Sequence, residues 1–324
     1  MISVADERRA LLAEWLNAKN LLNEGKLSVA SADASFRRYF RLQNKEISYI
    51  AMDAPPNLED SLPFVEIGKW MKESGINVPE IFAKDLDHGF LVLSDFGDFH
   101  FQDAIQDHDK EILYSRASGE IIRMQTRLLD PQNRLPVFDK SWQIKELDIF
   151  REWCLPGISI DEYEKVLEPL ISEIDEIPKA FMHRDFHCRN LLICDEDTIG
   201  IIDFQGAMCG PITYDLVSLL RDCYVDNDPE WIDQMVKIFL NQLCSLNSEY
   251  NAVNEDQFIR WFDLAGLQRH LKCVGIFHRL KIRDNKPEYL KDVPRILSYI
   301  DQVLERHSEL KNIKALMNNA EILN

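Results

Sequence analysis

The spacing of apolar and polar residues divides the chain into a strand-rich first part and a mainly helical remainder. Residues 5 to about 24 place apolar side chains at helical spacing, and Gly25 can end that helix. Three strand-like runs follow, then a helix over 61–74, then two more strands. The five expected strands cover residues 26–30, 37–42, 47–53, 80–84 and 90–94.

Beyond residue 98 the apolar spacing is mostly helical. The expected helices cover residues 108–129, 161–177, 213–224, 229–246, 255–280 and 287–307. Short apolar runs at 179–182, 191–194 and 199–202 interrupt them, and the last two flank a polar turn, as in a hairpin. The pattern predicts an α+β chain with a small antiparallel sheet lobe (1–94), a hinge at 95–98, and a larger helical lobe (99–324).

Composition narrows the class of protein. The 324 residues are 46% hydrophobic and 28% charged, as in globular proteins. A net charge of −18 argues against nucleic acid and anionic membrane as partners, because both attract basic surfaces. No apolar run is long enough to span a bilayer, and the seven cysteines form no Cys-x-x-Cys pair. We therefore expect a soluble cytoplasmic protein with reduced thiols.

The segment 181–205 carries the strongest chemical signal. His183, Asp185 and Asn190 form a His-x-Asp-x-x-x-x-Asn pattern, and Asp203 with Phe204 follows the expected hairpin. This spacing suits phosphoryl transfer from ATP, in which one carboxylate orients the attacking hydroxyl while an amide oxygen and a second carboxylate hold Mg²⁺. These acids could instead be ordinary turn or capping residues. That alternative explains each residue singly but not their joint spacing.

Two segments, HRDFHCRNLL and IGIIDFQGAMCGPITYDLVSLL, resemble the aminoglycoside phosphotransferase and choline kinase superfamily. The resemblance extends from about residue 26 to residue 299 and implies a bilobal, protein-kinase-like fold that uses ATP and Mg²⁺. SADASFRRYFRL, AMDAPP and LQRHLKCVGIFHRLKIRD are more closely similar to the bacterial cell-wall amino-sugar kinases. That likeness implies phosphorylation of the anomeric hydroxyl of N-acetylmuramate or N-acetylglucosamine during peptidoglycan recycling.

Carried onto this sequence, the resemblance gives roles to five residues. It implies that Asp185 is the catalytic base and that Asn190 and Asp203 are the magnesium ligands. His183 resembles a structural histidine of the catalytic loop. Asp215 resembles a buried aspartate that accepts backbone hydrogen bonds from that loop, although it could also be a plain helix N-cap.

The nucleotide site departs from the usual kinase pattern. The loop 31–36 contains no glycine, and Met52 occupies the place where a phosphate-binding lysine is expected. We expect Ser35 and Phe36 of this loop and Arg38 on the following strand to bind the nucleotide, with Arg38 on an apolar strand face that covers it. The alternative is that Arg38 is a solvated strand residue.

Asp95 and Phe96 resemble the segment of the family in which backbone groups pair with the adenine edge. For the acceptor sugar, the residues next to the predicted chemistry are Arg184, His187 and Gln205, and Arg269 and His270 are donors on a late helix. A surface ion pair is the alternative for Arg269, and a partly buried helix position is the alternative for His270.

The sequence thus indicates an ATP- and Mg²⁺-dependent kinase of N-acetylated amino sugars. One alternative is a relative that acts on an aminoglycoside or on choline. Another is a pseudokinase, a binding module without turnover, which the missing lysine and glycines favour and the complete Asp185, Asn190 and Asp203 set opposes. The preferred sugar, the anomer, the replacement for the lysine and the oligomeric state are not readable from the sequence, and a monomer is compatible with it.

Overall fold

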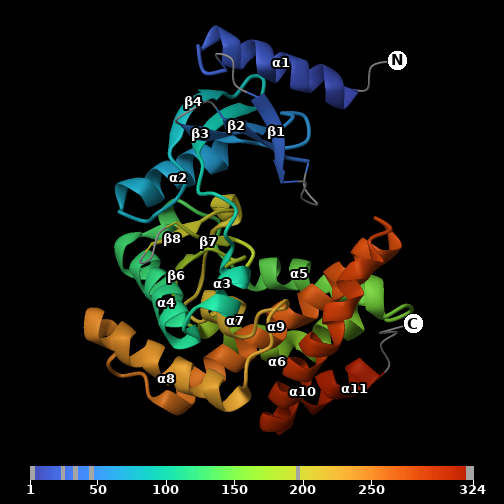
Figure 1. Ribbon diagram of the computed structural model, residues 1–324. Coiled ribbons are helices and arrows are strands. Elements are labelled where there is room, and N and C mark those ends of the chain that lie inside the picture. The colour runs from blue at the N-terminus through green and yellow to red at the C-terminus, as the bar shows by residue number, and fades with distance from the viewer. Residues whose placement is uncertain (1–3, 23–25, 32–35, 44–46, 195–197, 319–324) are drawn as a thin grey trace. The chain divides into compact units, whose positions relative to one another are not determined.

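The computed structural model describes residues 4–22, 26–31, 36–43, 47–194 and 198–318. The chain divides into two compact units. The first comprises Met1–Phe99 together with Leu192–Gln205, and the second comprises His100–Leu191 together with Gly206–Asn324. Figure 1 labels most of the helices and strands of both units.

The first unit is built on a five-stranded antiparallel sheet in the order β1-β2-β3-β5-β4. The strands are β1 (Lys26–Ser31), β2 (Arg38–Gln43), β3 (Ser48–Asp53), β4 (Ile81–Asp85) and β5 (Phe90–Ser94). Two helices accompany them, α1 (Val4–Ala18) and α2 (Leu62–Glu73). All five predicted strands are present, and no strand end differs from the prediction by more than one residue.

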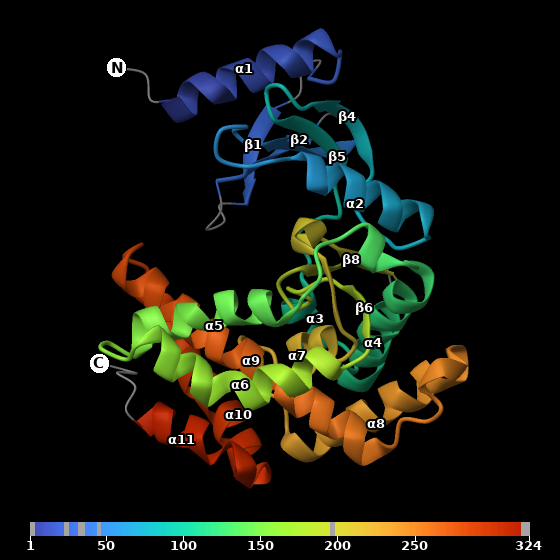
Figure 2. The ribbon, with the colours of Figure 1, turned by 180° about the vertical axis from the view of Figure 1, so that it is seen from behind.

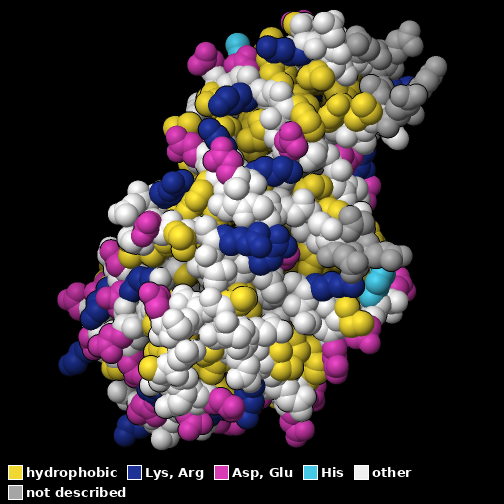
Figure 3. Space-filling view, turned by 90° about the vertical axis from the view of Figure 1, so that its left-hand side faces the viewer, with side chains coloured by type: hydrophobic (Ala, Val, Ile, Leu, Met, Phe, Trp, Pro, Cys, Tyr) yellow, Lys and Arg dark blue, Asp and Glu magenta, His cyan; other side chains and the backbone are white. Residues whose placement is uncertain are grey.

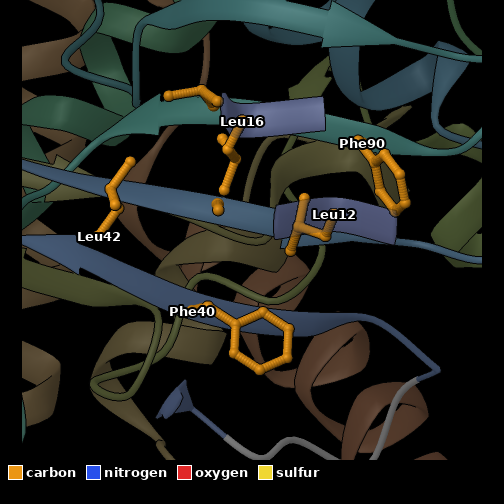
Figure 4. Packing of buried hydrophobic residues seen from close by; sticks show 7 residues of the cluster. Leu12, Leu16, Phe40, Leu42 and Phe90 are labelled. Carbon is orange, nitrogen blue, oxygen red and sulfur yellow. The ribbon is translucent and has the colours of Figure 1, made fainter. Parts of the chain in front are cut away.

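Helix α1 covers one face of this sheet. Leu12 and Leu16 of α1 form a buried cluster with Phe40 and Leu42 of β2 and with Phe90 of β5 (Figure 4). Alternate residues of a strand share a face, so Phe40 and Leu42 both point toward the helix. Burial of these side chains fixes α1 to the sheet, since each contributes about 1.5–3 kcal/mol when fully removed from water.

A hairpin also belongs to the first unit. Strands β7 (Leu191–Ile193) and β8 (Ile199–Ile201) pair as a two-stranded sheet, as the sequence predicted. The backbone of Asn77, just after α2, accepts a hydrogen bond from Ile201 N at 2.9 Å, and its side chain donates to the Ile199 carbonyl at 3.2 Å. The hairpin is therefore joined to the α2 end of this unit.

The second unit is mainly helical. Its helices are α3 (Phe101–Asp107), α4 (Lys110–Arg127), α5 (Lys140–Cys154), α6 (Ile160–Glu176), α7 (Tyr214–Leu220), α8 (Pro229–Leu246), α9 (Glu255–Ile282), α10 (Val293–Arg306) and α11 (Lys311–Asn318). Side-chain caps mark where several of them begin, because an oxygen accepts the otherwise unpaired N–H groups of the first turn. The capping residues are Asp109, Asp139, Ser159, Asp228 and Asn254.

Helix α9 runs through the middle of the second unit and is buried on all sides between Phe262 and Val274. Helix α5 lies along it (Figure 2). A Cβ atom on Gly275 would lie 2.6 Å from the backbone nitrogen of Phe150, so glycine is required for this close approach. A two-stranded sheet of β6 (Lys179–Met182) and β9 (Met208–Pro211) completes the unit.

The architecture confirms the predicted α+β class, with a small antiparallel sheet unit and a larger helical unit. The prediction was incomplete in the second unit, because the sequence pattern gave no helix over α3, α5 or α11. Within the described residues no helix has the length and apolar character needed to cross a membrane. On the face shown in Figure 3, acidic and basic side chains are interspersed.

Candidate active site

The loop from His183 to Asn190 connects β6 to β7 and is held at its first residues by Asp215. The carboxylate of Asp215, in the first turn of α7, accepts hydrogen bonds from the backbone N–H groups of His183 (2.7 Å) and Arg184 (2.8 Å). Asp215 is almost fully buried. Hydrogen bonds to a buried carboxylate are short and strong, so Asp215 fixes the path of the chain into the loop. His183 is also buried, and its ring meets the edge of Phe186.

A second buried carboxylate holds the far side of the same loop. Asp222, just after α7, accepts a hydrogen bond from Cys188 N at 2.8 Å and another from Tyr224 N at 2.8 Å. Loop backbone groups that lie away from water need such partners. Asp215 at the start of the seven-residue helix α7 and Asp222 just after its end thus both accept hydrogen bonds from the backbone of the loop that carries Asp185.

Asp185 lies between these two anchors and is partly buried. Its carbonyl oxygen accepts hydrogen bonds from His187 N (3.0 Å) and from the amide nitrogen of Asn190 (2.9 Å). Burial alone would raise the pKa of Asp185, but nearby positive charges, led by Lys272, outweigh it and lower the pKa to about 2. Asp185 is therefore ionised across the physiological pH range.

Glu146 of α5 joins the loop to α9 through a buried polar cluster. Its carboxylate accepts from Arg184 Nε (2.9 Å) and from a terminal guanidinium nitrogen of Arg184 (2.6 Å), and it also accepts from Gln268 (3.1 Å). Lys272 Nζ lies 3.5 Å from the other Glu146 oxygen and donates to the Tyr214 hydroxyl at 2.9 Å. Burial raises the pKa of Glu146, but the charges of Lys272 and Arg184 reverse this and lower it, so Glu146 is the anion of the cluster.

The backbone of Arg184 is strained. Its φ of +80° lies in the left-handed region, where a non-glycine residue costs about 1–3 kcal/mol. The hydrogen bond from its N–H to Asp215 and the paired bonds from its guanidinium to Glu146 hold it there. The strained residue is therefore the one directly before Asp185, in a loop whose backbone is held by Asp215 and Asp222.

In the first unit, Asp203 is positioned by its apolar neighbour. The ring of Phe204 packs against Phe64 of α2, with ring centroids 4.8 Å apart. Gly68 of α2 makes room for this ring, since a Cβ atom there would lie 3.0 Å from it. Asp203 itself has a φ of +63°, is exposed, and accepts a hydrogen bond from the Gln205 amide at 2.6 Å.

Asn190 and Asp203 carry the donor types that Mg²⁺ prefers. The amide nitrogen of Asn190 is engaged by the Asp185 carbonyl, so its amide oxygen is directed away from that carbonyl. An amide oxygen and a carboxylate are hard ligands, and Mg²⁺ that arrives with a triphosphate needs only one or two of them. No cluster of three His, Cys, Asp or Glu residues within the described part forms a preassembled metal site. That Asn190 and Asp203 bind one ion together remains a prediction.

The residues of the first unit that were predicted to bind the nucleotide differ in exposure and in contacts. Ser35 lies outside the described residues, and Phe36 is exposed. Arg38 donates to the fully buried carboxylate of Asp53 at 3.0 Å. The strand face of Arg38 is the one that α1 covers, which differs from the expectation that it covers a nucleotide. A role for Arg38 in binding the triphosphate remains a prediction.

The segment after β5 is held by Arg41. The guanidinium of Arg41 donates to Asp95 at 2.6 and 3.0 Å and to Asp98 at 2.7 Å. Gly200 of β8 allows the Phe96 ring to approach closely, because a Cβ atom there would lie 2.5 Å from the ring. The expected backbone contacts of Asp95 and Phe96 with an adenine base remain a prediction.

The predicted acceptor residues fall into distinct environments. Arg184 pairs with Glu146, and Gln205 contacts Asp203. His270 is buried, shares a hydrogen bond with the Arg221 carbonyl at 3.0 Å, and has a pKa lowered to about 3 by burial and by the charge of Arg269.

His187 lies 3.5 Å from the Asn190 amide nitrogen and meets the edge of Tyr224. Arg269 is buried and donates to the sulfur of Cys223 at 3.5 Å.

Three residues of the cluster around Asp185 were not predicted from the sequence: Glu146, Gln268 and Lys272. Each is a polar residue on a buried helix face, and Glu146 and Lys272 are 126 residues apart. Asp222 was also missed. Its position seven residues after Asp215 was an available signal, because two aspartates at that spacing can lie at the two ends of one short helix.

Comparison with known proteins supplies the family. The model of the phosphotransferase enzyme family matches residues 26–245. The N-acetylmuramate/N-acetylglucosamine kinase of Pseudomonas aeruginosa is 36% identical over 300 residues, which cover 89% of this chain and 86% of the relative. The protein of the same name in Pseudomonas putida is 36% identical over 330 residues, covering 96% of each chain. That of Neisseria meningitidis is 33% identical over 324 residues, covering 96% of this chain and 95% of the relative.

Solved structures support the fold at much lower identity. An ethanolamine kinase of Plasmodium vivax aligns with a TM-score of 0.66 and 11% identity, covering 90% of this chain and 87% of its own. The ADP-bound aminoglycoside phosphotransferase APH(2″)-Ib aligns with a TM-score of 0.59 and 15% identity, and the alignment covers 91% of this chain and 98% of its own. At such identities the likeness concerns the fold alone, and it confirms the predicted kinase-like fold.

Proposed function

The chain belongs to the phosphotransferase enzyme family, and on that premise we propose that it transfers the γ-phosphoryl group of ATP to the anomeric hydroxyl of an N-acetylated amino sugar. The proposed acceptors are N-acetylmuramate and N-acetylglucosamine, the sugars in the names of its relatives. The products would be a sugar 1-phosphate and ADP. A role in peptidoglycan recycling and a cytoplasmic location, where ATP is available, are part of the same proposal.

One observation carries the chemical part of this proposal. Asp185 is ionised, with a pKa of about 2, on a loop whose backbone is fixed by Asp215 and Asp222. Phosphoryl transfer requires positioning more than covalent help from the protein, so a rigid, ionised carboxylate suits the reaction. The relatives, at 36% identity over most of both chains, support the choice of sugar.

In the proposed reaction Asp185 accepts a hydrogen bond from the C1 hydroxyl and orients it. The hydroxyl oxygen forms a bond to the γ-phosphorus, the bond from that phosphorus to the β–γ bridging oxygen breaks, and the proton passes to Asp185. Asn190 and Asp203 would hold Mg²⁺, which neutralises charge on the triphosphate when bound. Arg184 and Lys272 keep Asp185 ionised, since their positive charges lower its pKa.

The low pKa of Asp185 is compatible with an anomeric acceptor. A carboxylate of pKa about 2 is a weak base, so it suits a hydroxyl that is acidic for its class. The hydroxyl on C1 of a free sugar is more acidic than an ordinary alcohol. An aminoglycoside or choline hydroxyl lacks this advantage, which supports the sugar as acceptor.

Product identity tests the proposal. Purified protein with ATP and Mg²⁺ is incubated separately with N-acetylglucosamine, N-acetylmuramate, an aminoglycoside and choline, and phosphorus NMR follows the products. We expect sugar 1-phosphates from the first two acceptors and their absence with 1-O-methyl glycosides, whose C1 oxygen is blocked. Phosphorylation of a glycoside, or of choline alone, would overturn the anomeric assignment. Nucleotide binding without any product would instead support a pseudokinase.

A further inference from the structure

Arg269 is exceptional among the charged residues of the second unit. Only 2% of its surface is exposed. Among the described residues, the other buried lysine and arginine side chains each pair with a carboxylate, and the pairs are Arg37–Glu59, Arg221–Asp263 and Lys272–Glu146. Arg269 forms no such ion pair within the described part of the chain.

None of the contacts that Arg269 makes within the described residues is an ion pair, although the charge of Asp222 acts on it from a longer distance and helps to raise its pKa. One terminal nitrogen donates to the Cys223 sulfur at 3.5 Å, and a thiol is a weak acceptor. Its Nε is buried and has no hydrogen-bond partner among the described residues. A buried cation that lacks a paired carboxylate is expensive in free energy, so a carboxylate supplied by a ligand would stabilise Arg269.

Arg269 also lies beside the predicted chemistry. On α9 it precedes Lys272 by three residues, which is close to one helical turn, and Lys272 contacts the Glu146 cluster. On its other side, Cys223 follows Asp222, whose carboxylate holds the Asp185 loop through Cys188 N. The charge of Arg269 is among those that lower the pKa of Asp185. Two routes of contact therefore connect this guanidinium to the loop.

Three other basic groups near Asp185 do not offer a comparable site for an anion. Arg184 and Lys272 are both occupied by Glu146. His270 stays neutral, because burial and the charge of Arg269 lower its pKa to about 3.

The two proposed acceptors differ by one group, the lactyl ether of N-acetylmuramate, which carries a carboxylate.

We propose that Arg269 is the specificity-determining residue that binds the lactyl carboxylate of N-acetylmuramate. The inference rests on the proposed function, since it assigns a ligand group within that acceptor site. A guanidinium suits this task because it offers planar, paired donors to a carboxylate. N-acetylglucosamine lacks the carboxylate and reaches the same catalytic groups without using Arg269.

The test compares three acceptors with four proteins. The acceptors are N-acetylmuramate, its neutral methyl ester and N-acetylglucosamine. The proteins are the unaltered enzyme, Arg269→Gln, Arg269→Lys and the control Arg283→Gln, which removes a charge from an exposed position at the end of α9. The measured quantity is kcat/KM for each pair.

With the unaltered enzyme, esterification should lower kcat/KM for the muramate by about 10- to 100-fold, as expected for loss of a charge-assisted hydrogen bond. Arg269→Gln should lower kcat/KM for N-acetylmuramate by a similar factor and no longer distinguish acid from ester. Its kcat/KM for N-acetylglucosamine should change far less. Arg269→Lys should lie between, and Arg283→Gln should match the unaltered enzyme.

Two outcomes would overturn the inference. One is an equal fall for all three acceptors in Arg269→Gln, which would mark a structural role or an effect through Asp185. The other is indifference of the unaltered enzyme to esterification. If Arg269→Gln does not fold, the ester comparison on the unaltered enzyme and on Arg269→Lys still decides, because a role for Arg269 requires that the lysine variant discriminate less. Failure to phosphorylate either sugar would instead refute the proposed function.

Discussion

The two units support their site residues by different physical means. In the first unit, Asp203 is placed by the apolar packing of Phe204 against α2, where Gly68 makes room for the ring. In the second, Asp185 is placed by buried charge, through Asp215 on the loop backbone and Glu146 on Arg184.

Apolar packing tolerates small movements and does not depend on pH, whereas buried ion pairs are directional and fail sharply when one member is lost. The difference matches the two predicted tasks. A metal ligand must reach an ion that arrives with the nucleotide, while a base must hold a hydroxyl in one orientation. The comparison therefore predicts different consequences for mutations in each unit.

The largest difference should appear when each carboxylate is neutralised. Asp185→Asn should lower kcat about 10³-fold with unchanged ADP affinity, because it removes the base and leaves the nucleotide contacts. Asp203→Asn should instead raise the Mg²⁺ concentration needed for half-maximal rate by about tenfold or more. Steady-state rates over a magnesium titration distinguish the two. Identical responses of the two variants would contradict separate roles.

Loss of the anion in the polar cluster should be the largest effect on stability. Glu146→Gln deprives the partly buried Arg184 and the buried Lys272 of the carboxylate with which both pair, and we expect a loss of about 3 kcal/mol in the free energy of unfolding. The control is Glu120→Gln on α4, whose carboxylate pairs with the half-exposed Arg123. Urea denaturation compares the two. A loss in Glu146→Gln no greater than in the control would show that charge does not hold this loop.

A smaller effect is expected from overpacking the apolar support. In Gly68→Ala the new methyl group would lie about 3.0 Å from the Phe204 ring, which must shift. We expect a loss of about 1–2 kcal/mol and a raised Mg²⁺ requirement, because Asp203 moves with its neighbour. Gly119→Ala on α4 is the matched control, since open space surrounds that position and alanine favours helix. Equal stability changes in the two variants would argue against a close fit at Phe204.

Acid should destabilise the second unit through the buried His270 of α9, and this is the smallest expected effect. The pKa of His270 is lowered to about 3 in the folded protein, against about 6.5 when unfolded, so the unfolded chain binds more protons below pH 6.5. Stability should fall with pH from that point, by about 1.4 kcal/mol at pH 5.5. His270→Gln keeps a donor for the Arg221 carbonyl and should flatten this dependence, whereas His88→Gln on an exposed turn should not. Denaturation at pH 8 and pH 5.5 provides the measurement.

The sequence predicted the first unit well because its elements obey simple periodicities. Strand alternation in β2 puts Phe40 and Leu42 on one face, and that face is indeed the apolar one. Which side of the sheet would be covered could not be predicted, because it depends on how α1 folds back. The sequence placed Arg38 on a face that covers a nucleotide because the packing of α1 against that face could not be predicted.

In the second unit the same reasoning failed where polar residues face inward. The buried face of α5 contains Gln143 and Glu146 beside Leu147, Phe150 and Cys154, and this mixture hides the helical pattern. Helix α9 was predicted, but the pairing of its Lys272 with Glu146 joins residues far apart in the chain. The Asp185, Asn190 and Asp203 pattern was visible because it is local. The cluster behind Asp185 is assembled only by tertiary packing.

The left-handed backbone at position 184 favours glycine for stability, whereas the ion pair with Glu146 favours arginine for activity. Glycine would adopt a φ of +80° without strain, but it would release Glu146 and unbalance the charges around it. Directed evolution for heat resistance and directed evolution for turnover should therefore diverge at this codon. The first search would accept glycine if the polar cluster could be repaired elsewhere, and the second should keep returning to arginine.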